Sequence, residues 1–336
     1  MIGGETLFLE KNHKKVNQNH TEERNEGLPF NTKYFDAINI NRSAVERRVG
    51  TLTGRRSVKK EFQAAWLLKA ISMIDLTTLA GDDTRGNVLR LCEKAKHPVR
   101  EDILQKLGMQ DANLTTGAVC VYHNLIPYAK EALKGTNIPI AAVSTGFPAG
   151  KISLEEKITE IKKSVAAGAK EIDIVISRDL VLESKWKELY EEIKLCRQAC
   201  GDAHMKTILA TGEIPTYTKV AKASWVAMMA GSDFIKTSTG KESVNATLAV
   251  SLVMIRCIRE YYELTGVKVG YKPAGGIQKA KQALDYLILI KEELGNEWLN
   301  PDLFRFGASS LLGDIERQLE HYVTGRYSAN FRHPMA

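Results

Sequence analysis

The sequence predicts an α/β protein folded as a TIM (β/α)8 barrel, preceded by an N-terminal helical extension. Eight short apolar segments, each followed by a helical pattern, run from about residue 71 to the end of the chain. No long insertion interrupts this alternation, and a chain of 336 residues is long enough for one barrel domain. A doubly wound open sheet usually has fewer strands, so the barrel is the better prediction.

The chain before the barrel has a different composition. Residues 1 to about 40 are rich in Asn, Lys, Glu and His and show no apolar period, so we expect a poorly ordered extension. A short helix is expected over 43–51. A second helix is expected over 59–70, where Phe62, Trp66 and the leucines form an apolar stripe that would cover the bottom of the barrel. We therefore divide the chain into an extension (1–58), a barrel (59–327) and a tail (328–336).

The barrel elements follow in order along the chain. The expected strands are 71–76, 117–122, 139–145, 171–177, 206–211, 233–238, 267–272 and 303–307, and the helices include 153–167, 185–199, 215–230, 243–264 and 278–294. The active site of such a barrel lies at the C-terminal ends of its strands. Polar residues at those ends are therefore the candidates for chemistry.

Charge and cysteine content limit the class of protein. The net charge is +7, but the first 60 residues hold twelve basic and seven acidic residues, so most of the excess lies in the extension. A basic segment without interleaved aromatic residues is weak evidence for nucleic-acid binding, and we expect a solvated extension. The five cysteines have no paired spacing, which argues against a disulfide framework or a zinc site and favours a reducing compartment.

Membrane association is not expected, since no segment is apolar and long enough to span a bilayer and the N-terminus lacks a signal-peptide core. The expected location is the cytoplasm, with the nucleus left open.

Two lysines end neighbouring strands of the predicted barrel. Lys236 follows the apolar pair Phe234-Ile235 and precedes a small, hydroxyl-rich turn. Loss of hydration at the lip of a core favours a neutral amine, which could form a Schiff base; the alternative is a lysine that extends from the strand end into solvent. Lys272 ends the next strand 36 residues later, one β/α unit, so its ammonium would lie beside Lys236 and lower its pKa.

Other polar strand ends complete the candidate site. In the strand 171–177 the isoleucines share one face, so Asp173 points into the barrel, either in a structural ion pair or as an acid/base group for the lysines. Lys206 opens the following strand and either joins this charge cluster or faces solvent. Asp75 and Thr77 end the first strand and, with the following Asp82, Asp83 and Thr84, could contact substrate hydroxyls. Asp82, Asp83 or Thr84 could equally only cap the next helix.

The loops after the sixth, seventh and eighth strands are suited to an anion. Gly240, Gly275 and Gly276 leave backbone N–H groups accessible to a phosphate. Ser309 and Ser310 begin the helix after the eighth strand, where barrels often bind phosphate. Cys120, within an apolar strand, is expected to be a buried small hydrophobic residue.

The motifs in order resemble the deoxyribose-phosphate aldolase family from about residue 59 to 327: IDLTTL, AVCVY, TGFPAG, EIDIVI, KTILATGE, DFIKTSTGK, VNAT, KPAGGI and FGASSLL. The resemblance implies a class I aldolase on a TIM barrel. It implies reversible cleavage of 2-deoxy-D-ribose 5-phosphate to acetaldehyde and D-glyceraldehyde 3-phosphate, in deoxyribose phosphate catabolism, without a metal or other cofactor. The extension resembles that of the longer, animal-type members.

The resemblance also implies residue roles. Lys236 matches the Schiff-base lysine of the family, Lys272 its second essential lysine and Asp173 its acid/base aspartate. The implied phosphate contacts are Gly240, Lys241, Gly275, Gly276, Ser309 and Ser310. Two departures are evident: His123 follows AVCVY where the family commonly has proline, and the last tyrosine is Tyr327, to which we do not assign the proton-shuttle role of a C-terminal tyrosine.

Two other interpretations stay open at this point. A barrel of this kind could serve as a scaffold for phosphosugar or protein binding, with the basic extension recruiting a partner such as an RNA–protein assembly. It could also be an aldolase or isomerase of other sugar phosphates, because one barrel fold supports many reactions. A homo-oligomer is compatible with each of these.

Overall fold

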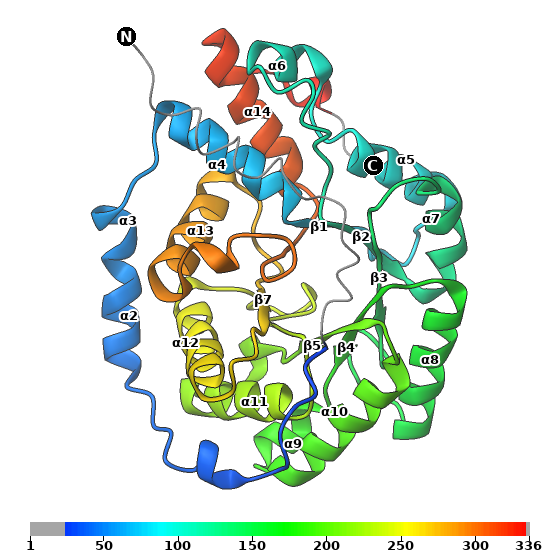
Figure 1. Cartoon of the computed structure of the whole chain (residues 1–336), viewed down its shortest axis with the longest axis vertical. Coiled ribbons are helices and arrows are strands. Elements are labelled where there is room, and N and C mark those ends of the chain that lie inside the picture. Colours follow the sequence, from blue (N-terminus) through cyan, green and yellow to red (C-terminus); the bar gives the residue numbers. More distant parts are fainter. Residues whose placement is uncertain (1–23, 334–336) are drawn as a thin grey trace.

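The computed structural model describes residues 24–333, and residues 1–23 of the predicted extension and 334–336 of the predicted tail lie outside them. Eight parallel strands form one sheet in the order β7-β6-β5-β4-β3-β2-β1-β8. Parallel bridges between Tyr271 and Phe304 and between Ala274 and Gly307 join the two ends of the sheet. The predicted TIM barrel is therefore confirmed, with helices on the outside of the strands (Figure 1).

The strands are short, and each ends within three residues of the predicted end. They are β1 (Ile74–Thr77), β2 (Ala118–Tyr122), β3 (Ile140–Ser144), β4 (Glu171–Val175), β5 (His204–Ile208), β6 (Phe234–Lys236), β7 (Gly270–Lys272) and β8 (Phe306–Ala308). The start of β1 was expected at Ile71, but Ile71 and Ser72 still belong to the preceding helix. The strand β5 begins two residues before Lys206, which moves this lysine from the strand's first position to its middle.

The helices of the described residues lie around the strands and within the N-terminal segment. They are α2 (Arg42–Gly50), α3 (Leu52–Arg55), α4 (Lys60–Ser72), α5 (Arg85–Lys96), α6 (Glu101–Lys106), α7 (Ile126–Ala132), α8 (Leu154–Ala167), α9 (Arg178–Leu182), α10 (Trp186–Cys200), α11 (Tyr217–Met229), α12 (Leu248–Thr265), α13 (Ala280–Leu294) and α14 (Leu311–Thr324). Short 3-10 helices cover Thr32–Tyr34, His123–Leu125, Thr211–Glu213, Asn296–Trp298 and Asn330–Arg332.

Alternation along the strands separates the core from the barrel interior. In β4, Ile172 and Ile174 belong to the hydrophobic core between strands and helices, while Glu171 and Asp173 occupy the alternate positions. The register pairs Asp173 with Lys206 on β5 and Lys236 with Lys272 on β6 and β7. The barrel therefore brings charged residues that are distant in sequence into one enclosed space.

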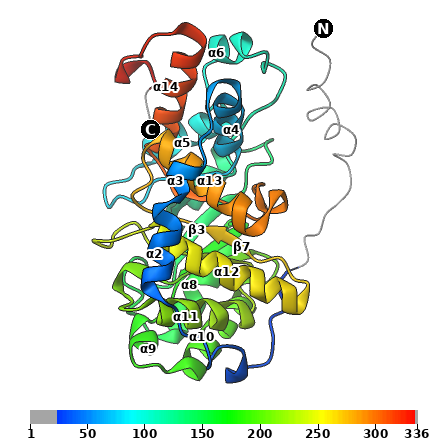
Figure 2. The same cartoon turned by 90° about the vertical axis from the view of Figure 1, so that its left-hand side faces the viewer.

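Residues 24–40 make defined long-range contacts, contrary to the poorly ordered extension expected from composition. The backbone N–H of Asn25 donates to Asp233 Oδ1 over 2.9 Å, and its side-chain amide donates to the carbonyls of Met228 and Ser232. Phe35 is fully buried. The chain then runs as α2 and α3 along the outside of α12 and α13 (Figures 1 and 2).

The helix α4 was expected to cover the bottom of the barrel, but it lies elsewhere. It packs against α13 and α14 on the outside, and Phe62 is 57% exposed. The bottom instead has a cavity of about 730 Å³, lined among others by Gly117, Glu171, His204 and Arg305 at the starts of the strands. In the part of the chain that the structure describes, none of the helices combines the length and hydropathy needed to cross a bilayer.

Candidate active site

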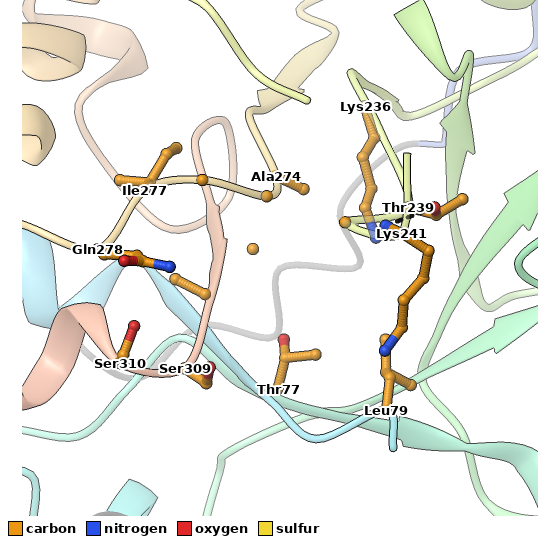
Figure 3. A pocket seen from close by; sticks show the side chains of 15 residues that line it. Thr77, Leu79, Lys236, Thr239, Lys241, Ala274, Ile277, Gln278, Ser309 and Ser310 are labelled. Atoms are coloured by element: carbon orange, nitrogen blue, oxygen red, sulfur yellow. Dashed lines mark hydrogen bonds between the residues drawn. The ribbon is translucent and has the colours of Figure 1, made fainter. Parts of the chain in front are cut away.

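A cavity of about 230 Å³ lies at the C-terminal ends of the strands, on the side that the sequence predicted. Its walls come from the loops after β1, β6, β7 and β8 (Figure 3). Lys236 enters it from the end of β6, while Thr77, Ser309 and Ser310 lie across the cavity from it (Figure 3). One candidate nucleophile therefore faces a wall of hydroxyl and backbone groups.

A group of seven charged side chains, which we call the buried charge cluster, lies inside the barrel next to this cavity. Its members are Asp75, Glu171, Asp173, Lys206, Lys236, Lys272 and Arg305, each at most 4% exposed. Asp173 is the central carboxylate. Its Oδ2 accepts from Lys236 Nζ at 2.8 Å and from Lys272 Nζ at 2.7 Å, and its Oδ1 accepts from Lys206 Nζ at 3.1 Å.

The two lysines at the strand ends have opposite electrostatic environments. Burial lowers the pKa of Lys236, and although Asp173 opposes this, the Lys272 ammonium lowers it further. Burial also disfavours the ammonium form of Lys272, but Asp173 and Asp75 outweigh it and raise the pKa of Lys272 above its ordinary value. This arrangement favours a free amine on Lys236 beside an ammonium on Lys272.

The carboxylates of the cluster stay ionised. Burial by itself would raise the pKa of Asp173, but Lys206, Lys236 and Lys272 hold it well below its ordinary value. Burial would also raise the pKa of Asp75, but Lys272 and Arg305 hold it below its ordinary value. Asp173 can therefore accept a proton or stabilise a cation, while it holds the amine of Lys236 in place.

Two glycines allow close packing around the cavity, and one of them leaves room for Lys272. A Cβ at Gly307 would lie 3.2 Å from Lys272 Cε and 2.7 Å from Ala274 Cβ, closer than ordinary van der Waals contact. Gly275 has a φ of +79°, and a Cβ there would lie 2.6 Å from Asn245 Cγ. Glycine at these two positions thus fixes the close packing of the loops around the cavity.

The cavity rim has the features of an anion site. Gly240, Lys241, Gly275 and Gly276 line it, as do Ser309 and Ser310 at the start of α14. The first turn of a helix carries unpaired N–H groups and the positive end of the helix dipole. The six residues predicted to contact phosphate therefore lie around one cavity, within the same space as Lys236 (Figure 3).

The remaining three candidates have different positions. Thr77 lines the cavity, and its hydroxyl donates to the Asp75 carbonyl at 2.6 Å. Asp75 does not line it, because its carboxylate is enclosed by Lys272 and Arg305, so this geometry gives no support to contact with substrate hydroxyls. Lys206 is fully buried against Glu171 and Asp173, which rules out the solvent-facing alternative.

Three further residues were singled out in the sequence. Cys120 is buried, and burial raises the pKa of its thiol to about 11. Tyr327 is 81% exposed, stacks on His321 and lines a different cavity between α6 and α14. His123 begins the short 3-10 helix that follows β2.

Glu171 and Arg305 belong to the buried charge cluster but were not predicted as site residues. A signal for both was available in the alternation of the strands. Glu171 shares a face with Asp173, and Arg305 alternates with Phe304 and Phe306, which pack against each other with ring centroids 4.7 Å apart on the helix side.

Comparison with known proteins gives consistent matches over most of the chain. Residues 69–312 match the sequence model of the DeoC/LacD family aldolases. The chain is 58% identical over 314 residues to a deoxyribose-phosphate aldolase from Homo sapiens, covering 93% of this chain and 99% of the relative. It is 58% identical over 312 residues to a deoxyribose-phosphate aldolase from Mus musculus, covering 92% and 98%.

Solved structures agree with the fold. A tetrameric deoxyribose phosphate aldolase from Aeropyrum pernix superposes with a TM-score of 0.57 at 20% identity, covering 83% of this chain and 99% of that one. At this identity the likeness concerns the barrel alone.

Proposed function

The chain belongs to the deoxyribose-phosphate aldolase family of carbon–carbon lyases, and on that premise we propose that it cleaves 2-deoxy-D-ribose 5-phosphate through a Schiff base on Lys236. The observation that carries this proposal is the environment of Lys236, a buried lysine with a lowered pKa that opens into a cavity with an anion-binding rim. The products would be acetaldehyde and D-glyceraldehyde 3-phosphate, and the role would be catabolism of deoxyribose phosphate.

The free amine of Lys236 attacks the C1 aldehyde of the open-chain substrate. Loss of water from the carbinolamine gives a protonated imine, which accepts the electron pair of the C3–C4 bond when that bond breaks. The enamine left on Lys236 then takes up a proton at carbon and is hydrolysed to acetaldehyde. The C3–C4 electron pair passes to the imine while the C3 hydroxyl becomes a carbonyl, so no external oxidant or reductant is needed, and the water lost in forming the imine is regained in its hydrolysis.

Asp173 and Lys272 are the proton-transfer groups of this proposal. They contact each other at 2.7 Å, and Asp173 contacts the nucleophile at 2.8 Å. Neither lines the cavity, so we assign their proton exchange with substrate to a bridging water. Asp173 takes the C3 hydroxyl proton during cleavage, and the Lys272 ammonium assists the departure of water from the carbinolamine.

The phosphate of the substrate is assigned to the rim opposite Lys236. The backbone of Gly275 and Gly276 and the start of α14 at Ser309 and Ser310 supply positive potential there, and Lys241 adds positive charge from the Lys236 side of the cavity (Figure 3). A phosphate held across the cavity from Lys236 would orient the aldehyde end of the sugar toward the amine. This arrangement supports a phosphorylated sugar as the substrate.

Replacement of Lys236 with methionine tests the proposal. We expect turnover of 2-deoxy-D-ribose 5-phosphate to fall to background, measured by coupling glyceraldehyde 3-phosphate formation to NADH consumption. The matched control is Lys268→Met, a surface lysine paired with Glu297 at 2.7 Å, which should retain wild-type turnover. Near-normal turnover in folded Lys236→Met would refute the assignment.

The cytoplasmic location and self-association are also proposals. Analogy with the tetramer described for the Aeropyrum pernix protein supports a homo-oligomer. Light scattering of the full chain would measure its mass, and fractionation of cells would give its location.

A further inference from the structure

The buried charge cluster has an unusual balance. It contains three carboxylates, on Asp75, Glu171 and Asp173, against the cations of Lys206, Lys272 and Arg305 and the amine of Lys236. With Lys236 neutral the cluster has no net charge, and with Lys236 protonated it carries one excess positive charge. Because a net charge inside a barrel is poorly solvated, the balance itself favours the free amine.

Arg305 and Glu171 complete this balance from the end of the barrel opposite the catalytic cavity. Arg305 donates from its two terminal nitrogens to Asp75 Oδ1 at 2.5 Å and to Glu171 Oε1 at 2.9 Å. Glu171 Oε2 in turn accepts from Lys206 Nζ at 2.5 Å. Both residues line the lower cavity, and neither lines the catalytic one.

The fold provides a passage for the Arg305 side chain. A Cβ at Gly117, which precedes β2, would lie 3.3 Å from Arg305 Cδ and Nε and 2.8 Å from the Ser72 carbonyl oxygen. The arginine therefore passes over a glycine to reach carboxylates that precede it by 134 and 230 residues. Its guanidinium is held from both sides by carboxylates, a geometry suited to a fixed charge.

The links from Arg305 to Lys236 are continuous. Asp75 binds both Arg305 and Lys272, and Lys272 shares Asp173 Oδ2 with Lys236. On the other side, Glu171 binds Arg305 and Lys206, and Lys206 reaches Asp173 Oδ1. Two hydrogen-bonded paths thus join the lower end of the barrel to the nucleophile.

We propose that Arg305 and Glu171 are positioning residues that set the charge balance of the cluster and thereby keep Lys236 a free amine at neutral pH. This inference rests on the proposed function, in which Lys236 is the nucleophile. The groups that influence Lys236 directly are Asp173 on β4, Lys272 on β7 and Cys120 on β2, and the thiol of Cys120 is neutral. Arg305 and Glu171 act through the first two of these.

The sign of the effect follows from counting charges. Without the Arg305 cation the cluster is negative when Lys236 is neutral, so protonation of Lys236 restores the balance and the amine is freed only at higher pH. Without the Glu171 carboxylate the excess is positive, and the amine is freed at lower pH. Removing both charges leaves the balance as it is in the wild type.

The experiment uses the full-length chain and measures kcat/KM for 2-deoxy-D-ribose 5-phosphate between pH 5 and pH 10. The proteins are the wild type, Arg305→Gln, Glu171→Gln and the double variant. We expect the ascending midpoint to rise by about one pH unit in Arg305→Gln, which is about a tenfold loss of kcat/KM below the midpoint. It should fall in Glu171→Gln and return close to the wild-type value in the double variant.

The control is Arg56→Gln, which removes an exposed arginine paired with Glu292 at 3.0 Å and should leave the midpoint unchanged. Equal midpoints in all variants, or a double variant displaced as far as Arg305→Gln, would overturn the inference, since a merely structural arginine alters stability but not the midpoint. If Arg305→Gln does not fold, the Glu171→Gln midpoint decides, and an unmoved or raised value overturns the inference.

Trapping separates this inference from the proposed function. Borohydride reduction with acetaldehyde at several pH values reports the imine on Lys236 in each variant. An imine that forms on Lys236 with the same pH dependence throughout refutes the charge-balance role alone. Absence of an imine on the active wild-type protein refutes the proposed function instead.

Discussion

Replacing Gly307 with alanine tests whether Lys272 must hold its position beside Lys236. The new Cβ would lie 3.2 Å from Lys272 Cε and 2.7 Å from Ala274 Cβ, whereas carbon atoms in contact are about 3.5–4.0 Å apart. The backbone at Gly307 is not in the left-handed region, so the effect is purely steric. Relief of both contacts displaces Lys272 or the strand end by up to about 1 Å.

The expected result is a large loss of rate with a smaller loss of stability. A displacement of about 1 Å at a reacting group costs about a hundredfold in rate. Overpacking in a core costs about 1–3 kcal/mol in the free energy of unfolding. Steady-state kinetics gives kcat and KM, and urea denaturation gives the unfolding free energy. We expect kcat to fall through the displacement of Lys272, and KM to rise as well, because Gly307 lies two residues before Ser309 and lines the same cavity as the phosphate rim.

The matched control is Gly54→Ala, on the surface helix α3, where an added Cβ has no described heavy atom within 4 Å. It should retain wild-type kcat. A folded Gly307→Ala protein with kcat within twofold of the wild type would refute the claim that the position of Lys272 is critical.

The remaining predictions concern three other residues. Asp173→Asn should lower kcat by at least about a hundredfold and destabilise the fold by about 3–5 kcal/mol, because three lysines lose their shared carboxylate. Unchanged kinetics in this variant would exclude Asp173 as the proton-transfer group. Lys241→Met should raise KM for the phosphorylated substrate while leaving kcat/KM for unphosphorylated 2-deoxyribose unchanged, and an equal loss on both sugars would argue against a phosphate contact. Burial lowers the pKa of His204 to about 4 from an ordinary value of 6.5. As the pH falls, the imidazole is therefore protonated in the unfolded chain before it is protonated in the folded one. Up to about 3 kcal/mol of the free energy of unfolding is lost between pH 6.5 and pH 4. Urea unfolding of His204→Gln at pH 7 and pH 4.5 should show a smaller acid loss than the wild type, and an identical loss would contradict this.

The sequence was most informative where a strand pattern and an unexpected charge coincide. Lys236 and Lys272 end apolar segments one β/α unit apart, and the structure pairs them in register on β6 and β7. Asp173 was placed inside the barrel by the alternation of isoleucines, and it contacts both lysines. Local periodicity determines which face a side chain occupies, so these positions could be predicted without a structure.

Contacts that depend on how the barrel closes could not be predicted in the same way. Arg305 reaches Glu171 and Asp75 only because β8 lies beside β1 and Gly117 leaves a passage. The burial of Lys206 depends on a strand start that periodicity fixes only to within two residues. The order of residues 24–40 arises from long-range hydrogen bonds such as Asn25 to Asp233, which composition cannot reveal.

The central claim is that Lys236 forms a covalent imine, and the most direct measurement is borohydride reduction of the protein with acetaldehyde followed by peptide mass spectrometry. Borohydride converts an imine into a stable secondary amine, so the adduct records which lysine reacted. The account predicts a two-carbon adduct on the peptide that contains Lys236. An adduct on a different lysine, or none on protein that cleaves the substrate, would contradict it.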